Sequence, residues 1–139
     1  MILRKVINVL LIIDEVPLSK NQYVNLHWAS RAKYKERIAW LIQEQKSFEK
    51  LIKPDVYAEL PYGKASIIID IFFKSKRRRD VANYIGGGLI SWLDCLVDLG
   101  FIEDDSYDCI GQPQITFNID KDFPRCEIRI ERRINEVTR

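Results

Sequence analysis

Carboxylates beside a dense basic cluster are the residues of this chain best suited to chemistry. The basic cluster consists of Lys74, Lys76, Arg77, Arg78 and Arg79. Asp80 follows it directly, and Asp104 and Asp105 lie in an acidic cluster further along the chain. Hard cations such as Mg²⁺ bind one or two carboxylates, with water and substrate phosphate completing the shell, and such an ion can activate water against a phosphodiester. The pattern indicates metal-assisted phosphodiester chemistry, and its alternative is a pair of solvated turns.

Several other kinds of catalytic site are excluded by the sequence. It contains no phosphate-binding GxxxxGK[ST] loop, no GxSxG elbow and no HExxH motif. Its single histidine, His27, excludes most histidine-based metal sites and triads. The carboxylates and the basic cluster therefore remain the main candidates.

Two predicted elements must position these groups. Residues 65–73 are rich in Ile and Phe and predict a strand that leads directly into the basic cluster. Leu89, Trp92, Leu93, Leu96 and Val97 recur at helical spacing, and Gly100 is a typical helix stop. A helix of this length can return the chain toward the strand end, so we expect Asp80 to meet Asp104 or Asp105.

The remaining elements complete a small fold. The apolar run 6–13 predicts a first strand, and residues 17–25 predict an irregular polar loop. A helical pattern begins at about Ser30, which is a plausible N-cap, and residues 113–119 and 125–132 predict two final strands. The order strand, helix, strand, helix, strand, strand predicts an α/β or α+β fold with two main helices on one mixed sheet.

Bulk properties agree with an ordinary soluble domain. The chain has 139 residues, of which 47% are hydrophobic, so we expect one domain over residues 1–139. Its three cysteines suit neither a disulfide framework nor a metal site and favour a reducing cytoplasm. The run 6–13 is cut short by Asp14 and Glu15, so we expect no membrane association. The net charge of only +2 does not itself identify a nucleic-acid partner.

Three segments together resemble a known family. Residues 76–84 are similar to the arginine-rich lead and D-x-D-N motif of RusA-like Holliday-junction resolvases. Residues 93–106 resemble that family's helix, glycine and paired aspartates, and residues 17–23 resemble its N-terminal P-x-S-x-N loop. The resemblance covers nearly the whole chain in the family's order.

The resemblance implies a homodimeric, Mg²⁺- or Mn²⁺-dependent nuclease that cuts four-way DNA junctions symmetrically, in a phage or prophage setting. Asp80 and Asp105 match metal-binding, catalytic aspartates, and Asp104 is the neighbour most easily confused with Asp105. The residues expected to bind DNA are Lys74, Lys76, Arg77, Arg78, Arg79, Lys20, Asn21 and Asn83.

The sequence departs from the family pattern at two positions. Ala82 stands where a second aspartate is expected, and Gly86 stands where a lysine is expected. The run Gly86-Gly87-Gly88 is a poor helix interior and indicates either a flexible loop that approaches DNA or a decayed site. Lys74, Lys76 and Lys20 are all candidates to replace the missing charge. Two rivals to a nuclease follow: a junction-binding protein that has lost its activity, and an interaction domain whose clusters pair with each other.

Four aromatic residues carry two interpretations each. Trp40 and Trp92 lie on predicted helices as core or dimer contacts. His27 and Trp28 either stack on an unpaired base or pack within their loop. We expect the apolar surface of the helix over residues 89–99 to support the homodimer, because symmetric cuts require two sites.

Overall fold

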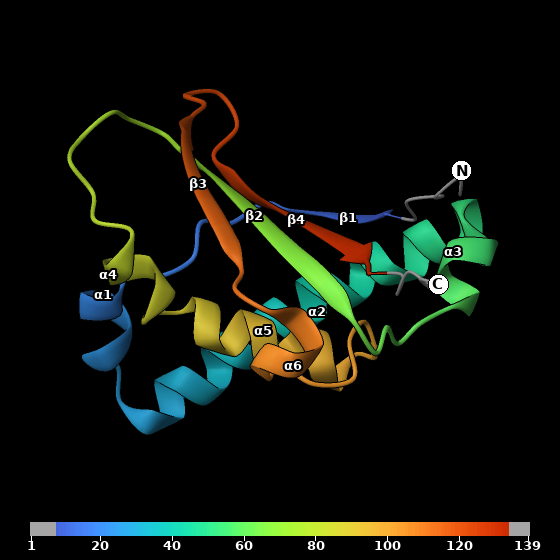
Figure 1. The fold of residues 1–139 in the computed structure, drawn as a ribbon. Coiled ribbons are helices and arrows are strands. Elements are labelled where there is room, and N and C mark those ends of the chain that lie inside the picture. Colours follow the sequence, from blue (N-terminus) through green and yellow to red (C-terminus); the bar gives the residue numbers. More distant parts are fainter. Residues whose placement is uncertain (1–7, 134–139) are drawn as a thin grey trace, which may run out of the picture.

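A four-stranded mixed sheet forms the centre of the computed structural model, which describes residues 8–133 (Figure 1). Its strands are β1 (Asn8–Ile13), β2 (Ala65–Phe73), β3 (Gln114–Ile119) and β4 (Arg125–Arg132). The spatial order is β1-β4-β2-β3, with β2 and β3 parallel and the other neighbours antiparallel. Parallel neighbours require a long crossover, and the helices between β2 and β3 supply it. The predicted α+β fold with a mixed sheet is confirmed.

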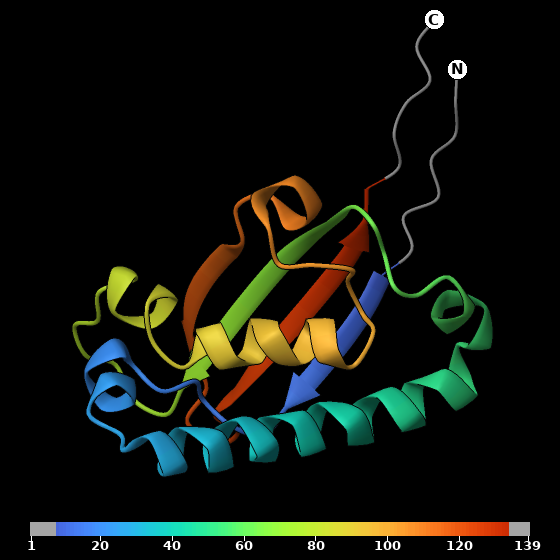
Figure 2. The same ribbon diagram turned by 90° about the horizontal axis from the view of Figure 1, so that it is seen from below.

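Two long helices cover one face of this sheet (Figure 2): α2 (Trp28–Ile52) and α5 (Leu89–Asp98). Alternate residues of β2, from Ala65 to Phe73, are buried beneath them, as the period of a one-faced strand requires. Trp92 of α5 is fully buried, and its Nε1 donates a hydrogen bond to the Tyr34 hydroxyl of α2 at 2.6 Å. The core therefore joins both helices to the sheet.

The predicted N-cap at Ser30 is wrong. Helix α2 begins at Trp28, and His27 is the N-cap, with an extended backbone and an Nδ1 atom that accepts a hydrogen bond from the Ala29 N–H at 3.3 Å. The apolar face of α2 begins later than the helix itself, at Tyr34, so the apolar pattern marked the buried stretch and not the first turn. Lys53 ends α2, and Pro54 starts the next helix.

The loop predicted at residues 17–25 is largely helical. Helix α1 (Lys20–Val24) forms there because Ser19 and Gln22 make a capping box. Three other short helices lie in connections: α3 (Pro54–Ala58), α4 (Ala82–Ile85) and α6 (Tyr107–Ile110). Turn-forming residues flank these segments, and the sequence pattern therefore did not predict their single helical turns.

Helix α5 ends as predicted, because Gly100 adopts a positive φ of 78°. Its apolar face is not available for a dimer, however, since Leu89, Trp92 and Leu96 are buried in the core. The expectation of a dimer surface on residues 89–99 was wrong in this respect. Trp40, the other tryptophan placed on a helix, is 61% exposed and is not a core residue.

Three further expectations from the sequence concern the first strand, the cysteines and membrane association. The strand predicted at residues 6–13 is observed from Asn8, and positions 6 and 7 lie outside the described residues. Cys95 and Cys126 are buried in the core as free thiols, and Cys109 is partly buried. Among residues 8–133, the helices are all too short or too polar to span a membrane.

Candidate functional site

The segment after β2 carries the basic cluster, and its arginines are not equivalent. The Arg79 guanidinium lies 3.8 Å from the centre of the Phe73 ring, and its Nη1 donates to the Ser75 carbonyl at 2.9 Å. This contact folds the segment back on the end of β2. Arg77 and Arg78 are exposed, so their guanidinium groups are available to a ligand.

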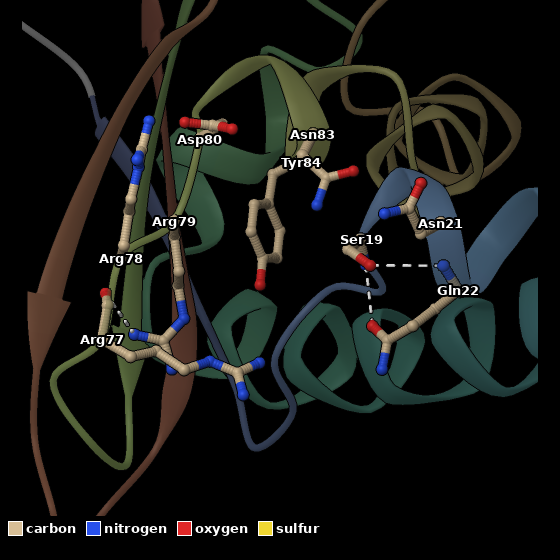
Figure 3. A pocket seen from close by; sticks show the side chains of 9 residues that line it. All are labelled: Ser19, Asn21, Gln22, Arg77, Arg78, Arg79, Asp80, Asn83 and Tyr84. Carbon is tan, nitrogen blue, oxygen red and sulfur yellow. Dashed lines mark hydrogen bonds between the residues drawn. The ribbon is translucent and has the colours of Figure 1, made fainter.

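These arginines open onto a pocket of about 310 Å³ (Figure 3). Its lining residues come from three segments: the basic segment, the turn into α4, and α1. They are Ser19, Asn21, Gln22, Arg77, Arg78, Arg79, Asp80, Asn83 and Tyr84. Guanidinium and amide groups match the oxygens of a phosphate. Among the residues predicted to bind DNA, the structure brings together Arg77, Arg78, Arg79, Asn21 and Asn83, and they surround Asp80.

The α1 wall of this pocket is held by a local network. The Ser19 side chain accepts from the Gln22 N–H at 3.3 Å, and the Gln22 side chain accepts from the Ser19 N–H at 3.0 Å (Figure 3). The preceding Leu18 N–H donates to the buried Tyr34 hydroxyl at 3.3 Å. Burial raises the pKa of this hydroxyl, so it stays protonated at neutral pH. The wall is thereby anchored in the core.

The glycine run has a packing role that neither sequence interpretation included. A Cβ at Gly87 would lie 2.6 Å from backbone atoms of Leu18 and Lys20, and one at Gly88 would lie 2.7 Å from the Tyr34 hydroxyl. The Gly88 N–H donates to the Leu18 carbonyl at 2.8 Å. Both glycines are buried. They let the N-terminal segment approach closely and do not form a loop extended toward a ligand.

Lys20 takes the space beside Gly86. A Cβ at Gly86 would lie 3.5 Å from Cδ of Lys20, so the lysine stem runs past the position where the family pattern has its own lysine. Lys74 and Lys76 are exposed and do not line the arginine pocket. Of the three lysines considered as replacements, Lys20 is the one that contacts this position.

The acidic cluster was expected to meet Asp80, but Asp105 of this cluster does not line the pocket that contains Asp80. Asp105 lines a second, mostly apolar pocket together with Leu93, and its carboxylate contributes to raising the pKa of Asp94 on α5. Asp80 and Asp105 line separate pockets, of which the first is also lined by Tyr84 of α4 and the second by Ile85 of α4.

Glu103 and Asp104, which directly precede Asp105 in the cluster, are not in this second pocket. Glu103 approaches Gly63, where a Cβ would lie 2.9 Å from its Oε2. Asp104 is exposed and lines neither pocket.

Asp94 and Asp105 are near enough for their carboxylates to interact, and we call them the acidic pair. Burial raises the pKa of Asp94, and the neighbouring Asp105 carboxylate raises it further, while Lys35 partly offsets both effects. A cation bound between the two carboxylates would relieve their repulsion, and two carboxylates are enough for Mg²⁺ when water and phosphate complete its shell. Within residues 8–133, no group of three or more potential ligands is assembled, so Asp80, Asp104 and Asp105 do not form one metal site here.

Sequence reasoning missed Asp94, Gln22 and Tyr84. Asp94 carried a usable signal, because it is an acidic residue within the otherwise apolar stretch 89–97. Gln22 carried another, three residues after Ser19 in the spacing of a capping box. The place of Tyr84 in the pocket had no local signal, because it depends on the packing of α4.

Comparison of the chain with models of known protein families and with curated proteins found no match. The assignment of a function therefore depends on the two pockets and their chemistry.

Proposed function

We propose that this protein is a metal-dependent endodeoxyribonuclease that cuts branched DNA, including four-way junctions, as a homodimer. One observation carries the proposal. Two segments that are far apart in the sequence and that resemble motifs of one nuclease family, residues 17–23 and 76–84, line one pocket, and the third, residues 93–106, lines a second pocket together with Ile85 of α4. The first pocket holds exposed arginines, side-chain amides and Asp80, and the second holds Asp105.

The first pocket would hold the DNA backbone. The exposed Arg77 and Arg78 can each donate two hydrogen bonds to a phosphate, and Asn21 and Asn83 can donate from their amides. Phosphate contacts position a protein on DNA without reading its sequence. Recognition would therefore depend on phosphate position and branch shape more than on sequence.

The acidic pair would hold the metal ion. Asp105, with Asp94 beside it, has the oxygen ligands that Mg²⁺ or Mn²⁺ prefers, and the bound ion would supply Lewis-acid activation of the phosphodiester and of water. Asp80 lies in the neighbouring pocket and would act on the ion only through water or the bound phosphate, not as a direct third ligand. Two copies related by a two-fold axis would present two such sites to opposing strands.

The test uses a four-way junction, a linear duplex and a single strand, each with Mg²⁺, Mn²⁺ or a chelator. We expect wild type to cut the junction only when metal is present. Asp105→Asn and Asp80→Asn should slow cutting by about 100-fold or more, because a catalytic metal lowers the barrier by several kcal/mol. Binding of the junction should stay equal or become tighter, since each change removes a negative charge near phosphate.

Asp55→Asn is the matched control, because Asp55 is an exposed aspartate on α3, at the opposite end of the molecule from α1 and α4 (Figure 1). It should cut as wild type does. An Asp105→Asn variant that cuts as fast as wild type would show that the metal lies elsewhere.

A second candidate is a junction-binding protein that does not cut. It is favoured by the separation of Asp80 and Asp105 into two pockets and by the absence of a third ligand from the described acidic pair. Wild type that binds the junction tightly and never cuts, with either metal, would support this candidate. Absence of any salt-sensitive DNA binding would contradict both and favour an interaction domain.

A further inference from the structure

Trp28 presents a large aromatic surface to solvent at the start of α2. Its exposed fraction is 75%, whereas a tryptophan usually buries most of its area. The His27 ring lies beside it, with 5.4 Å between ring centroids and an interplanar angle of 39°. The expectation that Trp28 packs within its loop is therefore wrong, and its indole is free to contact a ligand.

The position of Trp28 is fixed by its neighbours. It is the first residue of a 25-residue helix whose N-cap is His27. Arg31, one turn later, donates to the Val24 carbonyl at 2.8 Å, and its guanidinium lies 5.1 Å from the centre of the Tyr23 ring. The first turn of α2 is thereby tied to α1, and the indole is attached to a rigid support.

Trp28 lies one short helix away from the arginine pocket. Asn21 and Gln22 of α1 line that pocket, and α1 has five residues, which corresponds to a length of about 7.5 Å at 1.5 Å per residue. Figures 1 and 2 both show α1, α4 and the beginning of α2 at the same end of the molecule. A strand with its phosphates in the pocket could therefore extend past Trp28.

We infer that Trp28 is a stacking platform for an unpaired base of a DNA strand whose phosphates occupy the arginine pocket. The inference rests on the DNA-binding part of the proposed function and does not require cleavage. Basic grooves combined with aromatic side chains bind single-stranded segments, because every base offers a face for stacking. A fully paired duplex keeps these faces covered. Trp28 would therefore select DNA with unpaired bases, such as the centre of an open junction.

A protein partner is the other class of ligand for an exposed tryptophan. Nucleic acid is favoured here because Arg77 and Arg78, the exposed cations of the adjacent pocket, match phosphates in charge and geometry.

The test compares affinities of wild type, Trp28→Ala and Trp28→Phe in a chelating buffer, where cutting cannot interfere. The probes are a single-stranded oligodeoxynucleotide, the same strand with abasic sites, and a duplex of the same sequence. Trp28→Ala should bind the single strand at least about fivefold more weakly and the duplex less than about twofold more weakly. Trp28→Phe should recover part of the affinity. The abasic strand should be bound equally by wild type and Trp28→Ala.

Trp40→Ala is the matched control, because Trp40 is 61% exposed on the same helix about three turns further along. It should leave all affinities unchanged. In a Trp40→Phe background, emission from Trp28 should be quenched by the single strand and not by the duplex, while Trp92 is fully buried and gives a constant signal.

Equal effects of Trp28→Ala on single strand and duplex, or no effect on either, would overturn the inference. A change in self-association with unchanged DNA affinity would overturn it as well and would identify Trp28 as a protein contact. Wild type that binds single strands through Trp28 but never cuts a junction would support stacking and contradict the proposed nuclease. Wild type that binds no DNA form would overturn both.

Discussion

At the scale of single residues, the three consecutive arginines divide into two kinds. Arg79 is committed to Phe73 and to the Ser75 carbonyl, whereas Arg77 and Arg78 are exposed. The first kind shapes the segment, and the second is available for phosphate. Sequence alone gave all three the same role.

The different roles of these arginines predict that their alanine variants differ in the salt dependence of DNA binding. Arg77→Ala and Arg78→Ala should each weaken binding to all DNA forms and reduce the slope of log affinity against log salt by about 1, because each removes one phosphate contact and its released counterion. Arg79→Ala should change the slope less, and the triple alanine variant should flatten it most. Anisotropy titrations between about 50 and 200 mM salt measure these slopes, because such effects are large in that range. Unchanged affinity and slope in the triple variant would exclude the cluster as the DNA contact.

The acidic pair allows a second test at this scale, with a readout other than cutting. Mg²⁺ that binds the folded protein raises its stability by about 2.7 kcal/mol at a hundred times the dissociation constant, and the midpoint of thermal unfolding rises accordingly. We expect this rise in wild type and its loss in Asp94→Asn and in Asp105→Asn, with Asp55→Asn behaving as wild type. Equal rises in wild type and Asp94→Asn would remove Asp94 from the metal site.

At the scale of elements, the site depends on how closely two segments approach. The N-terminal segment that carries α1 packs against Gly87 and Gly88, which precede α5. Tyr34 joins the two through its hydroxyl, which accepts from Leu18 and from Trp92. The arginine pocket is therefore built on a contact between elements and not on one loop.

Gly87→Ala should disrupt this contact. Its Cβ would lie 2.6 Å from three backbone atoms that cannot turn aside as a flexible side chain can, so we expect a loss of about 1–3 kcal/mol in the free energy of unfolding. Gly86→Ala is the matched control, because its Cβ would meet Lys20 at an ordinary 3.5 Å, and its effect should stay within about 0.5 kcal/mol. Denaturant unfolding measures both. Equal stability of the two variants would contradict the packing role of Gly87.

At the scale of the whole molecule, symmetric cutting requires a dimer whose two sites each reach one DNA strand. The α5 face is buried, but the last turns of α2 expose Phe48, Leu51 and Ile52. Exposed apolar side chains on one helix are typical of surfaces between subunits. A dimer would therefore use a surface other than the one the sequence suggested.

We expect sedimentation at micromolar concentration to show a species of twice the 16.4 kDa chain mass, because symmetric cutting of a junction requires two sites related by a two-fold axis. The measurement is made with and without junction DNA. Only monomer under both conditions would contradict the homodimer and, with it, the symmetric mode of cutting.

The sequence by itself determined the elements whose signals are local. The strand at β2, the helical spacing of α5 and the stop at Gly100 were all predicted, because residue composition, period and backbone preference act within a few residues. The order of these elements was sufficient for the α+β class with a mixed sheet. The first turn of α2 and the short helices were not predicted, since caps and single turns leave weak signals.

Only the tertiary structure decided which of the chemical groups meet. The arginines lie with Asn21 and Asn83, whereas Asp105 lies with Asp94 and not with Asp80. The return path after α5 sets this outcome: Glu103 is held by its N–H bond to the Tyr62 carbonyl, and the chain then brings Asp105 back to α5. Asn21 lies more than fifty positions before the arginines, and the packing that joins them leaves no periodic trace along the chain.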